Sequence, residues 1–189
     1  MAKAMFWDLE TTGFSTKWDY ILEIGAAMYD EETQEILAEF SELIKPGKNI
    51  TPKIFEITGI SNAMVANARS EKEVLMDFTE WVAIHKPDKM VGHNIKSFDK
   101  RFGLDRSEKY GLKLNLPDEI VDTLTIARRL SKAGEIKVEN HKQPTICEFY
   151  GIDISGAHRA LNDVHANIKM YEKMGLNPSK KSRRAKAGF

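Results

Sequence analysis

Four carboxylates and one histidine lie in three separate segments of the chain, and their types suit the binding of divalent metal ions. The segments are residues 8–13 (DLETTG), 93–99 (HNIKSFD) and 158–163 (HRALND). Carboxylate oxygens are ligands that hard divalent cations prefer, and a histidine beside them can accept a proton near neutral pH. If the segments meet in the folded chain, they could hydrolyse a phosphodiester with two metal ions. The candidate residues are Asp8, Glu10, Asp99, His158 and Asp163.

The first pair of carboxylates is expected at the end of a β-strand that covers residues 3–9. Side chains two residues apart in a strand point to the same face, so Asp8 and Glu10 would lie side by side. Gly13 permits a sharp turn of the backbone directly after them. Two carboxylates this close repel each other unless a cation lies between them. The alternative is a solvated acidic pair at a strand end, because such pairs are common.

The second and third segments are each expected at a turn that leads into a helix. Asp99 would lie in the first turn of a helix over residues 98–110, where it could instead serve only the helix dipole. His158 and Asp163 are five residues apart, which on one continuous helix would separate them by about 140°. They can converge if His158 lies in the loop before the helix and Asp163 in its first turn. Residues 155–157 (SGA) supply such a loop.

Length and composition predict a single globular domain. The chain has 189 residues, of which 42% are hydrophobic and 30% charged, as is usual for soluble domains. Its single cysteine, Cys147, excludes an intramolecular disulfide, and its apolar flanks predict a half-buried thiol rather than a nucleophile. No apolar stretch approaches the ~18 residues of a membrane span, and Asp8 comes too early for a signal peptide. We therefore expect a cytoplasmic protein.

The formal net charge is zero, but the charge is unevenly distributed. Five of the 28 basic residues and none of the 28 acidic residues lie beyond Met174, so residues 1–176 are acidic overall. An acidic body binds phosphates only if cations offset its carboxylates. Residues 96–113 lean basic and would form either a phosphate-facing strip or a solvated helix face. Residues 177–189 are expected to form a basic, disordered tail.

The order of the expected elements indicates an α/β fold. Strands are expected over residues 3–9, 21–29, 36–44, 89–92 and 120–122, the first three as an antiparallel meander with short polar turns. Helices are expected over residues 52–57, 71–85, 98–110, 123–130, 144–150 and 160–174. Ser70 and Glu73 form a capping box at the start of the second helix. Residues 131–143 show no periodicity and predict a mobile loop.

In this order and spacing, the three segments resemble the DEDDh (DnaQ-like) 3′–5′ exonuclease superfamily, over about residues 4–176. Residues 8–13 look like its first motif, residues 93–99 its second, and residues 157–163 its third motif in the histidine form. Residues 57–60 (ITGI) and 121–124 (VDTL) are also similar to family sequence. One departure is visible, because three residues separate Asn94 from Phe98 where many members have two. The resemblance implies one domain, residues 1–176, with an RNase H-like fold in which helices flank a mixed five-stranded sheet.

The resemblance also implies a mechanism. Asp8, Glu10, Asp99 and Asp163 would bind two divalent cations, Mg²⁺ or Mn²⁺, and His158 would be the general base. The products would be 5′-mononucleotides released one at a time from a 3′ end. The substrate contacts implied by family position are Thr11, Thr12, Gly13, Ile57, His93, Asn94 and Phe98.

Two functions share this chemistry, and we favour the first. It is a DNA exonuclease similar to the proofreading epsilon subunit of bacterial DNA polymerase III, with single-stranded or frayed 3′ ends as substrate and a polymerase subunit as a potential partner. The second is a 3′–5′ exoribonuclease of the ribonuclease T or oligoribonuclease type, because catalytic carboxylates do not read the 2′-hydroxyl. A third reading, a catalytically idle nucleic-acid-binding module, fits less well because all five catalytic-type residues are present.

Overall fold

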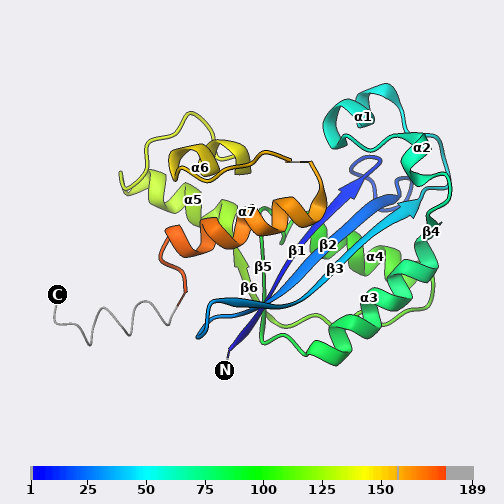
Figure 1. The fold of residues 1–189 in the computed structure, drawn as a ribbon, viewed down its shortest axis with the longest axis horizontal. Coiled ribbons are helices and arrows are strands. Elements are labelled where there is room, and N and C mark those ends of the chain that lie inside the picture. Colours follow the sequence, from blue (N-terminus) through cyan, green and yellow to red (C-terminus); the bar gives the residue numbers. More distant parts are fainter. Residues whose placement is uncertain (1, 157, 178–189) are drawn as a thin grey trace.

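A mixed β-sheet forms the centre of the molecule in the computed structural model, which describes residues 2–156 and 158–177 (Figure 1). In the described part of the chain the strand order is β4-β3-β2-β1-β5-β6. The strands are β1 (Lys3–Thr11), β2 (Ile21–Asp30), β3 (Glu35–Lys45), β4 (Arg69–Ser70), β5 (Lys89–Gly92) and β6 (Glu119–Asp122). The first three strands pair antiparallel, as predicted, and the other pairings are parallel. The sheet has one strand more than predicted, because the two-residue β4 is too short to show a periodicity.

Helices cover both faces of this sheet. They are α1 (Pro52–Thr58), α2 (Asn62–Val65), α3 (Glu71–His85), α4 (Asp99–Lys109), α5 (Thr123–Lys132), α6 (Gln143–Phe149) and α7 (Ala160–Lys173). The capping box is confirmed at the start of α3, where the backbone N–H of Ser70 donates to Glu73 Oε2 at 2.9 Å. The short α2 was not predicted, and α5 continues two residues further than expected. The predicted tail lies outside the described residues except for Asn177, which is buried.

The central strand β1 divides the core between the two faces of the sheet. Its residues Met5 and Trp7 pack in the cluster that includes α3 and α4, whereas Phe6 packs in the cluster that includes α7. Asp8 and Glu10 continue the series of Phe6, because alternate side chains of a strand share a face. Their carboxylates therefore point to the side of the sheet that α7 covers.

A glycine allows α7 to approach the sheet closely. A Cβ atom at Gly25 of β2 would lie 2.3 Å from the carbonyl carbon of Ala160, the first residue of α7. Any other residue at this position would push the start of the helix away from the strand. Since Gly25 pairs with Asp8 across the β1–β2 ladder, the start of α7 lies beside the acidic end of β1.

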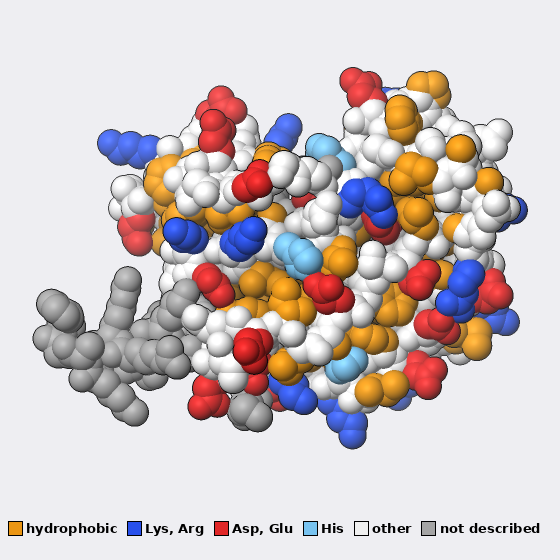
Figure 2. Space-filling view, viewed as in Figure 1, with side chains coloured by type: hydrophobic (Ala, Val, Ile, Leu, Met, Phe, Trp, Pro, Cys, Tyr) orange, Lys and Arg blue, Asp and Glu red, His pale blue; other side chains and the backbone are white. Residues whose placement is uncertain are grey.

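One of the six basic residues in the predicted basic strip over residues 96–113 is buried and does not lie on the surface. Arg106 of α4 is buried, and its Nε lies 3.0 Å from both carboxylate oxygens of Glu71 on α3. Removing one partner of a buried ion pair typically lowers the free energy of unfolding by ~3–5 kcal/mol. Loss of either residue should therefore weaken the packing of α4 against α3. On the face of the molecule seen in Figure 2, acidic, basic and hydrophobic side chains are intermixed.

Two further sequence predictions concern exposure. Cys147 lies on α6, as predicted, but is fully buried where a half-buried thiol was expected, and burial raises the pKa of this thiol to about 11. No helix in residues 2–156 and 158–177 is long and apolar enough to cross a bilayer.

Candidate active site

Three of the four predicted metal-binding carboxylates meet where β1 ends beside α7. Asp8, Glu10 and Asp163 each offer one carboxylate oxygen, and these three atoms lie within 4.8 Å of one another. They line a cleft of about 230 Å³. The other lining residues are Leu9, His93, Phe98, Asp99, Gln143, Pro144 and His158. The cleft therefore brings together the three segments that the sequence analysis singled out.

The fourth carboxylate, Asp99, belongs to the cleft but not to the close set of three oxygens. It is buried at the start of α4, and its Oδ1 accepts a hydrogen bond of 3.1 Å from the backbone N–H of Leu9. Leu9 lies between Asp8 and Glu10, so this bond fixes Asp99 to the acidic end of β1.

The electrostatics of the cleft favour cations. Burial, followed by the negative charges of Asp163 and Glu23, raises the pKa of Glu10 to about 8. Burial also raises the pKa of Asp99 to about 7. The pKa of Asp8 lies well above its usual range, through burial and then the charges of Asp99 and Glu10. A cluster of oxygen donors that repel one another in a buried place fits a hard divalent cation.

We expect the metal-free protein to lose stability as the pH rises from the ordinary pKa values of its buried carboxyl groups to about 8. The pKa values of Glu10 and Asp99 are raised in the folded state, so the unfolded chain releases these protons first. Their contribution to the free energy of unfolding is largest below their ordinary pKa values. It declines as the pH rises and is lost once the pH passes about 8. Thermal unfolding in EDTA at several pH values measures this decline. Glu10→Gln should make the decline shallower, and the exposed Glu108→Gln should not. An equally steep decline in Glu10→Gln would contradict the assignment.

His158 lies in the turn that precedes α7, where the sequence analysis placed it. Its backbone adopts a left-handed conformation with φ 70°, and its N–H donates to Asp163 Oδ2 at 3.0 Å. Its side chain is exposed and lines the cleft. The predicted convergence of His158 and Asp163, one in the loop and one in the first helical turn, is therefore observed.

An ion pair between the buried Glu23 and the half-exposed Arg159, which the sequence analysis missed, holds this segment on the sheet. Glu23 of β2 is buried, and its carboxylate accepts bonds from Arg159 Nη2 at 2.7 Å and from the Ala160 N–H at 2.9 Å. Glu23 also pairs with Glu10 across the β1–β2 ladder. The sequence did contain a signal, because Glu23 is the single charged residue in the apolar run of residues 21–28 (ILEIGAAM). A charge buried in such a strand requires a partner.

Asp122 at the end of β6, to which the sequence analysis assigned no role although residues 121–124 resemble family sequence, shapes the second segment. Its carboxylate accepts bonds from the backbone N–H groups of Asn94 at 3.3 Å and Lys96 at 3.2 Å. It also caps α5. Asn94 has φ 70°, which turns the chain toward Asp99. Three residues separate Asn94 from Phe98, and the turn accommodates the first of them, Ile95, by burying its side chain in the core.

The predicted substrate contacts of the second segment have different surroundings. Both ring nitrogens of His93 are held by protein groups, one 3.1 Å from Thr123 Oγ1 and the other 2.8 Å from the carbonyl of His141. Asn94 lines a neighbouring hollow of about 560 Å³ that also includes Arg128 and Lys142. Phe98 lines the acidic cleft itself. His93 is thus placed to fix the loop before α6 as well as to line the cleft.

The predicted contacts of the first segment form a tight turn. Thr11 Oγ1 donates to the carbonyl of Gly13 at 2.7 Å, and Thr12 Oγ1 donates to Asp19 at 3.1 Å. A Cβ atom at Gly13 would lie 2.5 Å from the Asp19 carboxylate, so only glycine fits here. Ile57, by contrast, is half-exposed on α1 and is not among the residues that line the cleft.

Gln143, the first residue of α6, also contacts the acidic cluster. Its Nε2 donates to the Asp163 carbonyl at 3.0 Å and lies 3.3 Å from Asp163 Oδ1. No sequence signal marked this residue, because its contact with Asp163 depends on how α6 packs on α7.

Similarity to known proteins agrees with this arrangement. A family model described as Exonuclease, of the RNase T type, matches residues 5–171. The PolC-type DNA polymerase III of Bacillus cereus is 34% identical over 168 residues, covering 88% of this chain and 11% of the polymerase. That of Thermotoga maritima is 33% identical over 176 residues, covering 89% and 12%. The chain thus spans about a tenth of the length of these curated relatives.

Solved structures share the fold. A structure of exonuclease I superposes with a TM-score of 0.83 at 20% identity, covering 94% of this chain and 41% of that one. Escherichia coli exonuclease I in complex with a dT13 oligonucleotide gives a TM-score of 0.83 at 19% identity, covering 97% and 43%. The RNase H-like α/β fold inferred from the sequence is confirmed. Because the family match extends over nearly all of the described residues, the chain belongs to the RNase T family of exonucleases, within the DEDDh (DnaQ-like) superfamily.

Proposed function

We propose that this protein is a metal-dependent 3′–5′ exonuclease that removes 5′-mononucleotides from the 3′ end of DNA. The observation that carries the proposal is the convergence of Asp8, Glu10 and Asp163 in a cleft that His158 also lines. DNA is favoured over RNA because the similar proteins include PolC-type DNA polymerases and an exonuclease I solved with a DNA oligonucleotide. Because the polymerase relatives contain the matching segment as a small part of their length, a DNA polymerase is the first protein partner to test.

The carboxylates of the cleft would hold the metal ions. Asp8, Glu10 and Asp163 offer the close oxygens, and Asp99, which lines the same cleft, would offer another. Bound divalent ions, two in our proposal, would stabilise the charge that develops on the phosphate and ease deprotonation of the attacking water. Mg²⁺ and Mn²⁺ suit an all-oxygen donor set. Escherichia coli exonuclease I, which shares the fold, has been solved in a zinc-bound form with single-stranded DNA.

His158 would act as the general base of the reaction. Its exposed imidazole reaches both the cleft and the solvent, so it can take a proton from the attacking water and release it afterwards. The water oxygen would form the new bond to phosphorus, and the bond from phosphorus to the 3′ oxygen of the preceding nucleotide would break. The bond from the His158 N–H to Asp163 ties the base to the metal-binding cluster.

Phe98 would contact the base of the terminal nucleotide. It is half-buried at the wall of the cleft, directly before Asp99. Stacking on an aromatic ring is tolerant of base identity, as removal of any terminal nucleotide requires. The turn formed by residues 11–13 directly follows Glu10, which lines the cleft, and would limit the space available to the terminal sugar.

A cleavage time course tests the proposal. Oligonucleotides labelled at the 5′ end would be incubated with Mg²⁺, with Mn²⁺ or with EDTA, as single-stranded DNA, 3′-mispaired duplex DNA and single-stranded RNA. We expect a metal-dependent ladder that shortens from the 3′ end, with DNA preferred. Preferred cleavage of RNA would replace the DNA assignment with an exoribonuclease. No cleavage of any substrate would contradict the exonuclease itself.

A further inference from the structure

The segment between β1 and β2, residues 12–20, carries two large aromatic side chains into the solvent. Phe14 is 90% exposed and Trp18 is 69% exposed, the highest values among the exposed large hydrophobic residues described. Lys17 is also exposed, and its Nζ lies 4.9 Å from the centroid of the Trp18 ring. Exposed aromatic rings beside a cation suit the recognition of a partner that has both π-faces and negative charge. We call residues 12–20 the aromatic loop.

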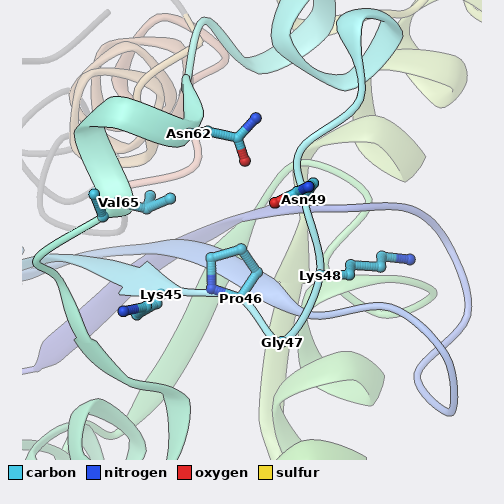
Figure 3. A pocket seen from close by; sticks show the side chains of 8 residues that line it. Lys45, Pro46, Gly47, Lys48, Asn49, Asn62 and Val65 are labelled. Carbon is cyan, nitrogen blue, oxygen red and sulfur yellow. The ribbon is translucent and has the colours of Figure 1, made fainter.

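The aromatic loop is held firmly at its β2 end by a single carboxylate. Asp19 accepts hydrogen bonds from Thr12 Oγ1 at 3.1 Å, from the Ser15 N–H at 2.9 Å and from Lys48 Nζ at 2.5 Å. Lys48 lies on the segment after β3 and is among the residues that line the pocket in Figure 3, where its side chain extends away from Asn62. Lys48 also donates to the Trp18 carbonyl at 3.3 Å. The backbone that carries Trp18 is therefore fixed by an ion pair and by direct bonds.

The middle of the loop is held by α4. Thr16 Oγ1 donates to Asp105 at 2.7 Å, and Arg106 Nη1 donates to the Thr16 carbonyl at 3.3 Å. Arg106 is itself fixed by the buried Glu71. The backbone that carries the two exposed rings is thus held by bonds from α4 and from Lys48. Because the loop is already ordered, little conformational entropy would be lost when a ligand binds to it.

The loop is continuous with the proposed catalytic cleft. The Phe14 ring meets the Phe98 ring edge-on at a centroid distance of 6.0 Å, and Phe98 lines the cleft. Trp18 lies one turn beyond Phe14, because its backbone N–H donates to the carbonyl of Ser15, the residue after Phe14. A second exposed cation, Arg101, lies 3.8 Å from the same Asp105 carboxylate that binds Thr16. The loop that carries the exposed aromatic rings and Lys17 therefore adjoins the cleft through Phe14.

We propose that Phe14 and Trp18 form a stacking surface for the unpaired nucleotides on the 5′ side of the scissile linkage of single-stranded DNA. Lys17 and Arg101 would contact the backbone phosphates of those nucleotides. The inference rests on the proposed function for the position of the 3′ end. It adds a requirement for several unpaired nucleotides, because a base within a duplex presents no free face to a ring.

Tryptophan fluorescence tests this surface directly. Trp7 is buried and Trp81 is packed against the core, so Trp18 is the tryptophan that a ligand can reach. The titrant is dT10 with a phosphorothioate at its 3′ linkage to slow cleavage, in the presence of Mg²⁺. We expect quenching by dT10 but not by a blunt duplex, and no quenching in Trp18→Ala. Since base stacking contributes ~1–3 kcal/mol per base, Trp18→Ala should weaken dT10 binding about tenfold.

Hydrolysis of two substrates separates this surface from the active site. The p-nitrophenyl ester of thymidine 5′-phosphate occupies only the terminal position, whereas dT10 extends beyond it. Trp18→Ala should lower kcat/KM about tenfold for dT10 and leave it unchanged for the ester. Phe149→Ala, which truncates an exposed aromatic on α6, is the matched control and should change neither.

The two proposals fail in different ways. The stacking surface would be overturned if Trp18→Ala bound dT10 as tightly as the unmodified protein, or if it lost the same factor on both substrates. A protein that binds dT10 through Trp18 but cleaves neither substrate would retain the stacking surface and lose the exonuclease assignment.

Discussion

Asp8→Ala should lower the metal-dependent hydrolysis of DNA by at least about 10³-fold while the protein remains folded. Asp8 lies at the centre of the cleft, beside the carboxylates of Glu10 and Asp163. Metal ions contribute several kcal/mol to the stabilisation of a phosphoryl transition state, and each ~1.4 kcal/mol corresponds to a factor of ten in rate. The measurement is kcat/KM for a single-stranded oligonucleotide at saturating Mg²⁺.

The fold should survive this change because the Asp8 carboxylate is repelled by its neighbours. Burial and the charges of Asp99 and Glu10 raise its pKa, so its ionised form costs stability in the metal-free protein. Asp8→Ala should therefore unfold in EDTA at pH 8 at the same temperature as the unmodified protein or a higher one. Glu42→Ala on β3, which is outside the cleft, serves as the control and should keep full activity. Full activity in Asp8→Ala would refute the metal assignment.

His158→Ala should lower kcat by about 10²–10⁴-fold with little change in the affinity for DNA. General-base catalysis ordinarily contributes a factor of this size. Binding should persist because the metal-binding carboxylates and the aromatic side chains of Phe14 and Phe98 remain. Single-turnover rates and equilibrium binding of the same oligonucleotide separate the two effects.

His165→Ala provides a matched control for the general base. His165 lies on α7 two residues beyond Asp163, but its Nε2 is 2.5 Å from Glu39 of β3 and it does not line the cleft. Its removal should leave kcat unchanged. Weakened DNA binding with a normal rate of cleavage in His158→Ala would assign His158 to substrate binding in place of proton transfer.

Local rules of sequence were enough to predict most of the elements and the core of the site. The alternation of side chains in β1 puts Asp8 and Glu10 on one face whatever lies opposite them, because this period is a property of the strand alone. The capping box at Ser70 begins α3 as predicted, since its two hydrogen bonds join residues only three apart. The placement of His158 in a loop and Asp163 in the next helical turn follows in the same way from a break in helical periodicity. The roles assigned to these residues remain predictions.

Only the tertiary structure decided which elements face each other. Glu23 lies opposite Glu10 through the β1–β2 register, and it binds Arg159, 136 residues further along the chain. Asp99 is held by the backbone of Leu9, 90 residues earlier, which separates it from the close set of three oxygens. Trp18 is exposed on a loop that is held by bonds from Lys48, which follows β3, and from α4. Periodicity identifies the buried face of one element. Strand register and the packing of distant elements depend on the whole core, so the sequence pattern alone does not predict the contacts of Glu23 with Arg159 and of Asp99 with Leu9.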